Sequence, residues 1–257
     1  MAVPFGPWST PVPILEISAG GAEDDPTLTG DLLEVYFNLN GDIYGSTRGA
    51  VSDPWPTPVP IAAVNSTTAT ETTCEVSPDG LELYFSSNRL GGSGGQDIYV
   101  STRQNRGDPF GQPMRIPQLA SGGDDVTATT FTPSGLVMYL TSTRAGTLDM
   151  YRTTRMSRTT PWAAPMLVTE LQTPGTETEP TLTPGETLMV FSGDGPGIRD
   201  LYTTSRATAA APWETPVPIA ELNTGASEED PWMSPDGRTL VFASNRGGGY
   251  ELYISTR

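Results

Sequence analysis

The chain has 257 residues and a formal net charge of −16, and its 14 basic residues are all arginine, since it contains neither lysine nor histidine. These absences exclude Ser-His-Asp and Cys-His catalysis, lysine Schiff bases and histidine-ligated metal centres. The negative charge disfavours nucleic acid and anionic membrane surfaces as partners, no apolar run is long enough for membrane insertion, and the single cysteine supports no disulfide framework.

An internal repeat of about 50 residues dominates the chain. A tyrosine recurs at Tyr44, Tyr99, Tyr151, Tyr202 and Tyr253, and an arginine stands four positions after each of them. A period of this length with short β-rich segments is typical of propeller blades. We therefore predict an all-β chain that forms a five-bladed β-propeller of four-stranded antiparallel blades, in one domain spanning 1–257.

The predicted blades follow one another along the chain, and the two ends complete each other. An isolated strand at 11–17 comes first and has the pattern of an outermost strand. Complete blades follow at about 25–64, 73–119, 128–171 and 179–222, and the last copy, 230–257, has three strands but no outermost one. Pairing 11–17 with this copy completes the fifth blade, and such velcro closure leaves no inner edge unpaired.

The second copy shows how one repeat predicts one blade. An innermost strand at 74–77 leads into the turn Pro78-Asp79-Gly80, in which proline presets φ and glycine takes a positive φ. Strands at 81–86 and 97–102 follow, with a glycine-rich loop between them. The outermost strand is expected at 113–119, where proline is tolerated because an edge strand need not donate every hydrogen bond.

Two further positions recur in every copy and suggest structural roles. The arginines four residues after each tyrosine are expected to pack along a strand end or to bind loop carbonyl groups. An aromatic residue in the connection to the outermost strand is expected to seal the blade edge or to pack between blades. These aromatic residues are Trp8, Trp55, Phe110, Trp162 and Trp213.

The repeats resemble the TolB-type, WD-like β-propeller repeats. The pattern Ser-Pro-Asp-Gly, then Leu-Tyr-Phe-Ser-Ser-x-Arg, then Asp-Ile-Tyr is matched closely at 77–99 and 234–253, moderately at 183–202, and loosely at 29–44 and 132–151. The resemblance implies a bacterial propeller, periplasmic or extracellular, that acts as a non-enzymatic binding or docking module. The chain departs from the best-known relative by having five blades instead of six and by lacking its N-terminal α/β domain, and no catalytic residue comes with the motif.

Acidic residues recur just before the innermost strands. They form two sets of equivalent positions, whereas the third copy has Asp124 and Asp125 shifted along the loop. Repetition about the propeller axis predicts carboxylates around one channel mouth, where a cation would relieve their repulsion, and Ca²⁺ suits such oxygen ligands best. The alternative is that these side chains point into solvent or pair with neighbouring arginines. The candidate metal ligands are Glu23, Glu71, Glu177 and Glu228 in the first set, and Asp25, Glu179 and Asp230 in the second.

Ligand-binding residues are expected on the same face. Trp232 stands where other copies have threonine or glutamate, which predicts an indole beside the channel, and Arg89, Arg144 and Arg246 occupy adjacent loops. The loops at 88–96 and 193–197 depart most from the repeat. We expect the propeller to be a monomer that binds a cation, a protein segment or another ligand at this face.

Two other functions remain open at this point. Carboxylate pairs can serve as acid and base in glycoside hydrolysis, which needs neither histidine nor lysine. A lectin with one sugar site per blade is the third possibility. The repetition of the acids from blade to blade favours the binding module, because catalysis needs carboxyl groups in unlike environments.

Overall fold

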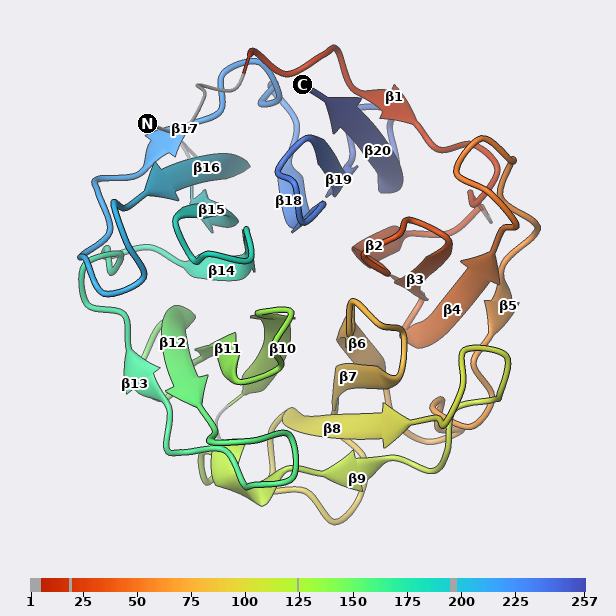
Figure 1. Cartoon of the computed structure of the whole chain (residues 1–257), viewed down its shortest axis with the longest axis vertical. Helices are drawn as coiled ribbons and strands as arrows, with labels where there is room; N and C mark the ends of the chain where they lie inside the picture. Colours follow the sequence, from red (N-terminus) through yellow and green to blue (C-terminus); the bar gives the residue numbers. More distant parts are fainter. Residues whose placement is uncertain (1–5, 19, 124, 195–197) are drawn as a thin grey trace.

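The computed structural model describes residues 6–18, 20–123, 125–194 and 198–257, and these form five four-stranded antiparallel sheets arranged around a central axis (Figure 1). The predicted five-bladed β-propeller is therefore confirmed. In the described residues the only helical element is a short 3₁₀ turn, η1 (Pro117–Leu119). No helix of this part of the chain is long and apolar enough to cross a membrane.

Each blade runs from an innermost strand at the axis to an outermost strand at the rim. The first blade contains β2 (Glu23–Leu28), β3 (Glu34–Leu39), β4 (Asp42–Thr47) and β5 (Val59–Pro60). The second contains β6 (Glu71–Val76), β7 (Glu82–Ser87), β8 (Asp97–Thr102) and β9 (Met114–Arg115). The third contains β10 (Val126–Phe131), β11 (Val137–Ser142), β12 (Asp149–Thr154) and β13 (Met166–Leu167). The fourth contains β14 (Glu177–Leu182), β15 (Leu188–Asp194), β16 (Arg199–Ser205) and β17 (Val217–Pro218). The fifth contains β18 (Glu228–Met233), β19 (Thr239–Ser244), β20 (Glu251–Thr256) and β1 (Val12–Pro13).

The hydrophobic core lies between blades. Leu83 and Phe85 of β7 are fully buried and belong to one cluster with Tyr36 and Ile43 of the first blade. Four similar clusters fill the other boundaries between blades. Each blade therefore needs its neighbours to bury its faces, as expected for a repeat architecture.

Velcro closure joins the two ends of the chain in the fifth blade. Strand β1 pairs with β20, with Pro13 opposite Tyr253, and Ser9 N donates to the Thr256 carbonyl at 2.8 Å. The outermost strand is much shorter than the predicted 11–17. Proline residues at both 11 and 13 remove backbone donors, which limits the ladder that this segment can form.

The innermost strands begin earlier than predicted and contain a β-bulge. Strand β6 starts at Glu71, three residues before the expected start, so the acidic segments belong to strands and not to loops. The third residue of four innermost strands has a positive φ between 45° and 54°. The strand register shifts at the same place, which turns this residue out of the regular pleat. The four residues are Asp25, Thr73, Glu179 and Asp230.

The recurring arginine and aromatic residues form one structural unit in every blade. In the second blade, the Arg103 guanidinium lies 4.5 Å from the centre of the Phe110 ring, and its Nε donates to the Gly80 carbonyl. The same stacking occurs in the other four blades at 4.0–4.3 Å, on tryptophan. Both predicted roles of these arginines are confirmed, and the aromatic rings pack in the clusters between neighbouring blades, which is the second of their two predicted roles.

Candidate functional site: the acidic end of the channel

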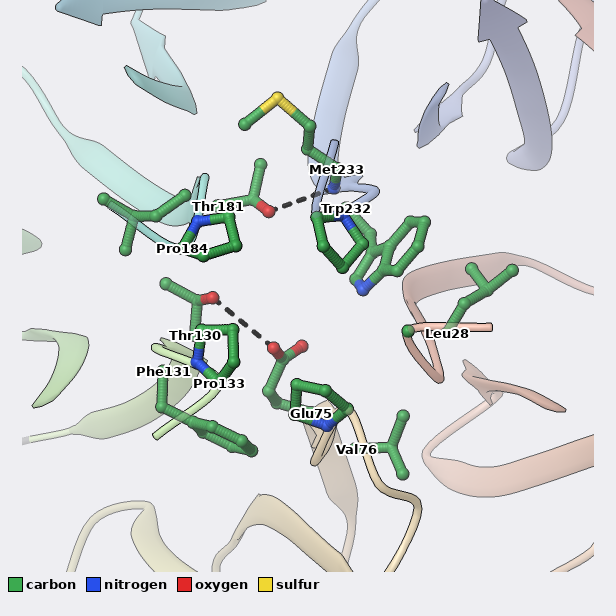
Figure 2. A pocket seen from close by; sticks show the side chains of 14 residues that line it. Leu28, Glu75, Val76, Thr130, Phe131, Pro133, Thr181, Pro184, Trp232 and Met233 are labelled. Atoms are coloured by element: carbon green, nitrogen blue, oxygen red, sulfur yellow. Dashed lines mark hydrogen bonds between the residues drawn. The ribbon is translucent and has the colours of Figure 1, made fainter. Parts of the chain in front are cut away.

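The central channel is almost filled by side chains from the innermost strands. At the end where these strands begin, a cavity of about 20 Å³ is lined by residues that include Asp25, Thr73, Glu179 and Asp230. Towards the opposite end, a cavity of about 30 Å³ is lined by proline residues of the tight turns and by Glu75 (Figure 2). Each cavity holds about one or two water molecules.

The third residues of the innermost strands connect neighbouring blades. Asp230 Oδ2 of the fifth blade accepts a hydrogen bond from Asp25 N at 3.3 Å, and Asp25 Oδ2 accepts one from Thr73 N at 2.8 Å. The positive φ at the bulge leaves these backbone donors outside the regular ladder, where the carboxyl groups satisfy them. Two residues of the second predicted set therefore hold three blades together.

A second layer of side chains crosses the channel two residues further along the strands. Thr27 Oγ1 accepts a hydrogen bond from Val76 N at 3.1 Å and donates to Glu75 Oε2 at 2.8 Å. Thr130 Oγ1 donates to the other Glu75 oxygen at 3.4 Å, and Thr181 Oγ1 accepts from Met233 N (Figure 2). Burial raises the pKa of Glu75 to about 8, although both threonine hydroxyls favour its charged form.

Five carboxyl groups gather at the acidic end, and we call them the acidic mouth. Burial, together with the nearby charges of Glu229, Glu179 and Glu23, raises the pKa of Asp24 to about 7. Burial, together with the neighbouring acids, also holds the pKa values of Asp25 and Asp230 well above their ordinary range. The members of the acidic mouth are Asp24, Asp25, Glu179, Glu229 and Asp230.

One arginine provides the positive charge within this group. Arg199 Nη1 lies 3.5 Å from Glu179 Oε2, and its Nε lies 3.4 Å from Glu229 Oε2, so the guanidinium bridges the fourth and fifth blades. In the first blade, one oxygen of Asp24 is buried without a hydrogen-bond partner in the described part of the chain. The acidic mouth therefore already holds one guanidinium and leaves a buried carboxylate oxygen unsatisfied.

The first predicted set does not converge at the channel, which corrects our expectation. Glu71 is fully buried inside its own blade, where it accepts hydrogen bonds from Ser66 N, Ser87 Oγ and Arg89 Nη2 at 2.7–2.9 Å. Glu228 is bound in the same way by Thr224, Ser244 and Arg246. The glutamates at the first strand position, which are structural groups of the blade, are Glu23, Glu71, Glu177 and Glu228.

The predicted ligand-binding arginines also belong to the blades. Their Nη2 atoms donate to the carbonyls of Val64, Leu119 and Leu222, which fixes the segment before the innermost strand. In the third blade Val126 stands in place of the glutamate, and Arg144 donates hydrogen bonds to Ser142 Oγ and to the Leu119 carbonyl. The three arginines are Arg89, Arg144 and Arg246.

Trp232 lies beside the channel, as its position predicted, but its ring is buried. Only 6% of the residue is exposed, and the indole packs in the cluster that includes Leu28 of the first blade (Figure 2). No free aromatic platform is therefore offered at this point of the channel. Of the two divergent loops, 88–96 lies at the acidic end, whereas 195–197 fall outside the described residues.

The structure gives the Ca²⁺ hypothesis no ready ligand cage. Among the described residues, no three carboxylate or cysteine side chains are close enough to hold a metal ion. Sequence reasoning also missed four members of this region: Asp24, Glu75, Arg199 and Glu229. Glu75 had a visible signal, since it replaces the threonine that stands at 27, 130 and 181.

We expect Glu71→Gln to destabilise the fold by about 1–3 kcal/mol, because it removes the buried charge that pairs with Arg89 and replaces one acceptor oxygen, such as the one bound by Ser66 N, with a donor amide. Urea unfolding measures this free energy. Arg89→Gln should lower the free energy of unfolding less in the Glu71→Gln variant than in the wild-type protein, because Arg89 and Glu71 interact directly. Strict additivity of the two changes would contradict the assigned ion pair.

The fold and channel define this class of protein: a five-bladed β-propeller with velcro closure and an acidic channel mouth. No protein-family model and no curated protein sequence matches the chain. Among solved structures it is similar to an endo-arabinase from Bacteroides thetaiotaomicron, with 14% identity, 97% of each chain covered and a TM-score of 0.64. A GH62 hydrolase in complex with xylotriose is 13% identical, with 95% of each chain covered and a TM-score of 0.59.

TolB from Acinetobacter baumannii is a further similar structure. It is 19% identical, with 94% of this chain and 56% of TolB covered and a TM-score of 0.55. The chain thus spans little more than half the length of that protein. At these identities the likeness concerns the fold, and at that level the resemblance to TolB-type repeats is confirmed.

Proposed function

We propose that the chain is a non-enzymatic binding propeller whose acidic mouth accepts a cationic group, a guanidinium or an ammonium, from a protein partner. The observation that carries this proposal is the unsatisfied buried oxygen of Asp24 within five carboxyl groups that share one arginine. Arg199 already shows how a guanidinium lies between two of these acids. A second cation beside Asp24 would relieve the remaining repulsion.

The dimensions of the channel favour binding over glycoside hydrolysis. The two channel cavities, of about 20 and 30 Å³, have room for water but not for a sugar ring. Glu75, the acid with the most distinct environment, is buried between two threonines. An organic cation also suits the mouth better than a metal ion, because a guanidinium needs fewer converging ligands. A periplasmic or extracellular location and a monomeric state remain predictions.

Peptide titration tests the proposal. We expect the peptide acetyl-Gly-Arg-Gly-amide to bind at low ionic strength and its citrulline analogue, which is neutral and nearly isosteric, not to bind. The variant Asp24→Asn/Glu229→Gln should weaken binding about tenfold or more, since two mouth carboxylates are lost. Isothermal titration calorimetry measures both affinities.

Two controls separate the site from the overall negative charge. Glu221→Gln removes an exposed acid elsewhere and should leave the affinity unchanged. Binding should also release protons near pH 7, because a cation stabilises the charged form of Asp24, so the measured enthalpy should differ between phosphate and Tris buffers. Equal weakening by the control and the mouth variant would show attraction by net charge only and would refute the site.

A further inference from the structure

A wide groove lies at the rim, between the first and second blades. Its volume is about 750 Å³, within the range of small-molecule sites. One wall is formed by the segment around β5, including the exposed Pro56, Val59 and Pro60, and the other by the connection that contains Arg103 and Phe110. It is separate from the acidic mouth, with which it shares no lining residue.

Three residues that line this groove are smaller than their equivalents in every other copy. Gly45 corresponds to Val100, Arg152, Thr203 and Ile254 on the third strand. Phe110 stands where the other blades have tryptophan, as the shared stacking on arginine shows. Ala63, four residues after Val59, corresponds to Glu16, Gln118, Glu170 and Glu221.

The equivalent groove between the fifth and first blades shows the effect of these side chains. There Trp55, Ile254 and Glu16 occupy the three positions, and the volume is only about 170 Å³. Part of the space beside Gly45 is taken by the ring of Tyr36, its partner on β3, since a Cβ atom would lie 2.8 Å from that ring. Among the described residues that line the groove, none takes the place of the second tryptophan ring or of the glutamate side chain.

The polar side chains inside the groove already have partners. Tyr36 donates to Glu34, Ser46 donates to the Pro56 carbonyl, and Arg106 binds Glu34 and Asp31. Arg103 likewise binds Glu34 and two loop carbonyls. A peptide backbone or an ion placed here would find few free hydrogen-bond partners among these side chains. Burying the polar groups of such a ligand without partners is costly. The groove therefore suits a neutral ligand with little polar surface.

We propose that this groove, with its floor formed by Tyr36, Gly45 and Phe110 and its wall by Ala63, binds a small neutral aromatic molecule. The second ring of the tryptophan and the longer side chains found at these positions in other blades define the shape of the ligand, because those groups fill the same place there. The edge-to-face pair of Tyr36 and Phe110, with ring centres 5.7 Å apart, is buried and closes the base of the groove. The site is independent of the cationic ligand proposed for the acidic mouth.

Indole is the probe, and backbone amide chemical shifts in NMR spectra are the readout. We expect indole to perturb amides around Gly45, Ser46 and Ile61, with an affinity in the millimolar range or better. Phe110→Trp and Ala63→Glu each restore the residue of another copy, so both should fold, and each should weaken binding at least tenfold. Val217→Ala, on the exposed outermost strand of the fourth blade, should leave the affinity unchanged.

Three results would overturn the proposal. One is the absence of groove-localised shifts at saturating indole, and another is unchanged binding in both restoring variants. The third is at least tenfold tighter binding of N-acetyl-tryptophanamide than of indole, because this would identify a peptide side chain, and not a free molecule, as the occupant. Since the arginine peptide is measured separately, failure here leaves the acidic mouth untouched.

Discussion

Glu75→Gln should raise the stability of the propeller at alkaline pH by about 2–4 kcal/mol and change it little near pH 5. The folded state holds the pKa of Glu75 at about 8, against 4.5 as the ordinary value, so between these pH values the folded chain keeps a proton that the unfolded chain has lost. Stability must therefore fall as pH rises through this window. Glutamine resembles the protonated acid and never ionises, so it removes this loss.

Urea unfolding at several pH values between 5 and 9 measures the effect. The wild-type protein should lose stability as pH rises, and Asp24, with its pKa raised to about 7, adds to the loss in the same direction. The variant should show a smaller slope. Glu170→Gln, at an exposed site, is the control. Parallel pH profiles for wild type and Glu75→Gln would disprove the raised pKa of Glu75 and the effect of burial that causes it.

Trp8→Ala should destabilise the protein by about 3–5 kcal/mol, the usual cost of removing a large buried aromatic side chain. Trp8 is 8% exposed, stacks 4.1 Å from the Arg257 guanidinium and packs in the cluster between the fourth and fifth blades. Because it stands beside the segment that closes the ring, its loss weakens both that boundary and the closure.

Thermal or urea unfolding measures this cost, with Val12→Ala as the matched control. Val12 lies on the same closing strand but is 55% exposed, so its truncation should cost less than about 0.5 kcal/mol. Hydrogen exchange should show faster opening of β20 in the Trp8 variant than of β8, which lies across the ring. A cost for Trp8→Ala as small as that for Val12→Ala would mean that Trp8 contributes little to the closure of the ring.

The repeat in the sequence was sufficient to predict the number of blades, their order and the closure of the ring. Each copy carries its own turn, strand and stacking signals, and the two incomplete ends complement each other, so counting the copies counts the blades. Strand bounds were also close where the pattern was regular, and β8 matches its expected range, 97–102. These features depend on residues that are close together in the sequence, so they can be predicted from the sequence alone.

The composition of the site depended on the tertiary structure. A bulge in the innermost strand changes which side chains face the axis, so Glu71 and Glu228 enter the blade while Asp25 and Asp230 reach the channel. No residue pattern indicated that Arg199 would bridge the acids of two blades. The rim groove likewise arises because residues 45, 63 and 110, each smaller than its equivalents in the other blades, meet across a blade boundary. Such sites are set by side chains that are distant in sequence, and only packing of the closed ring brings them together.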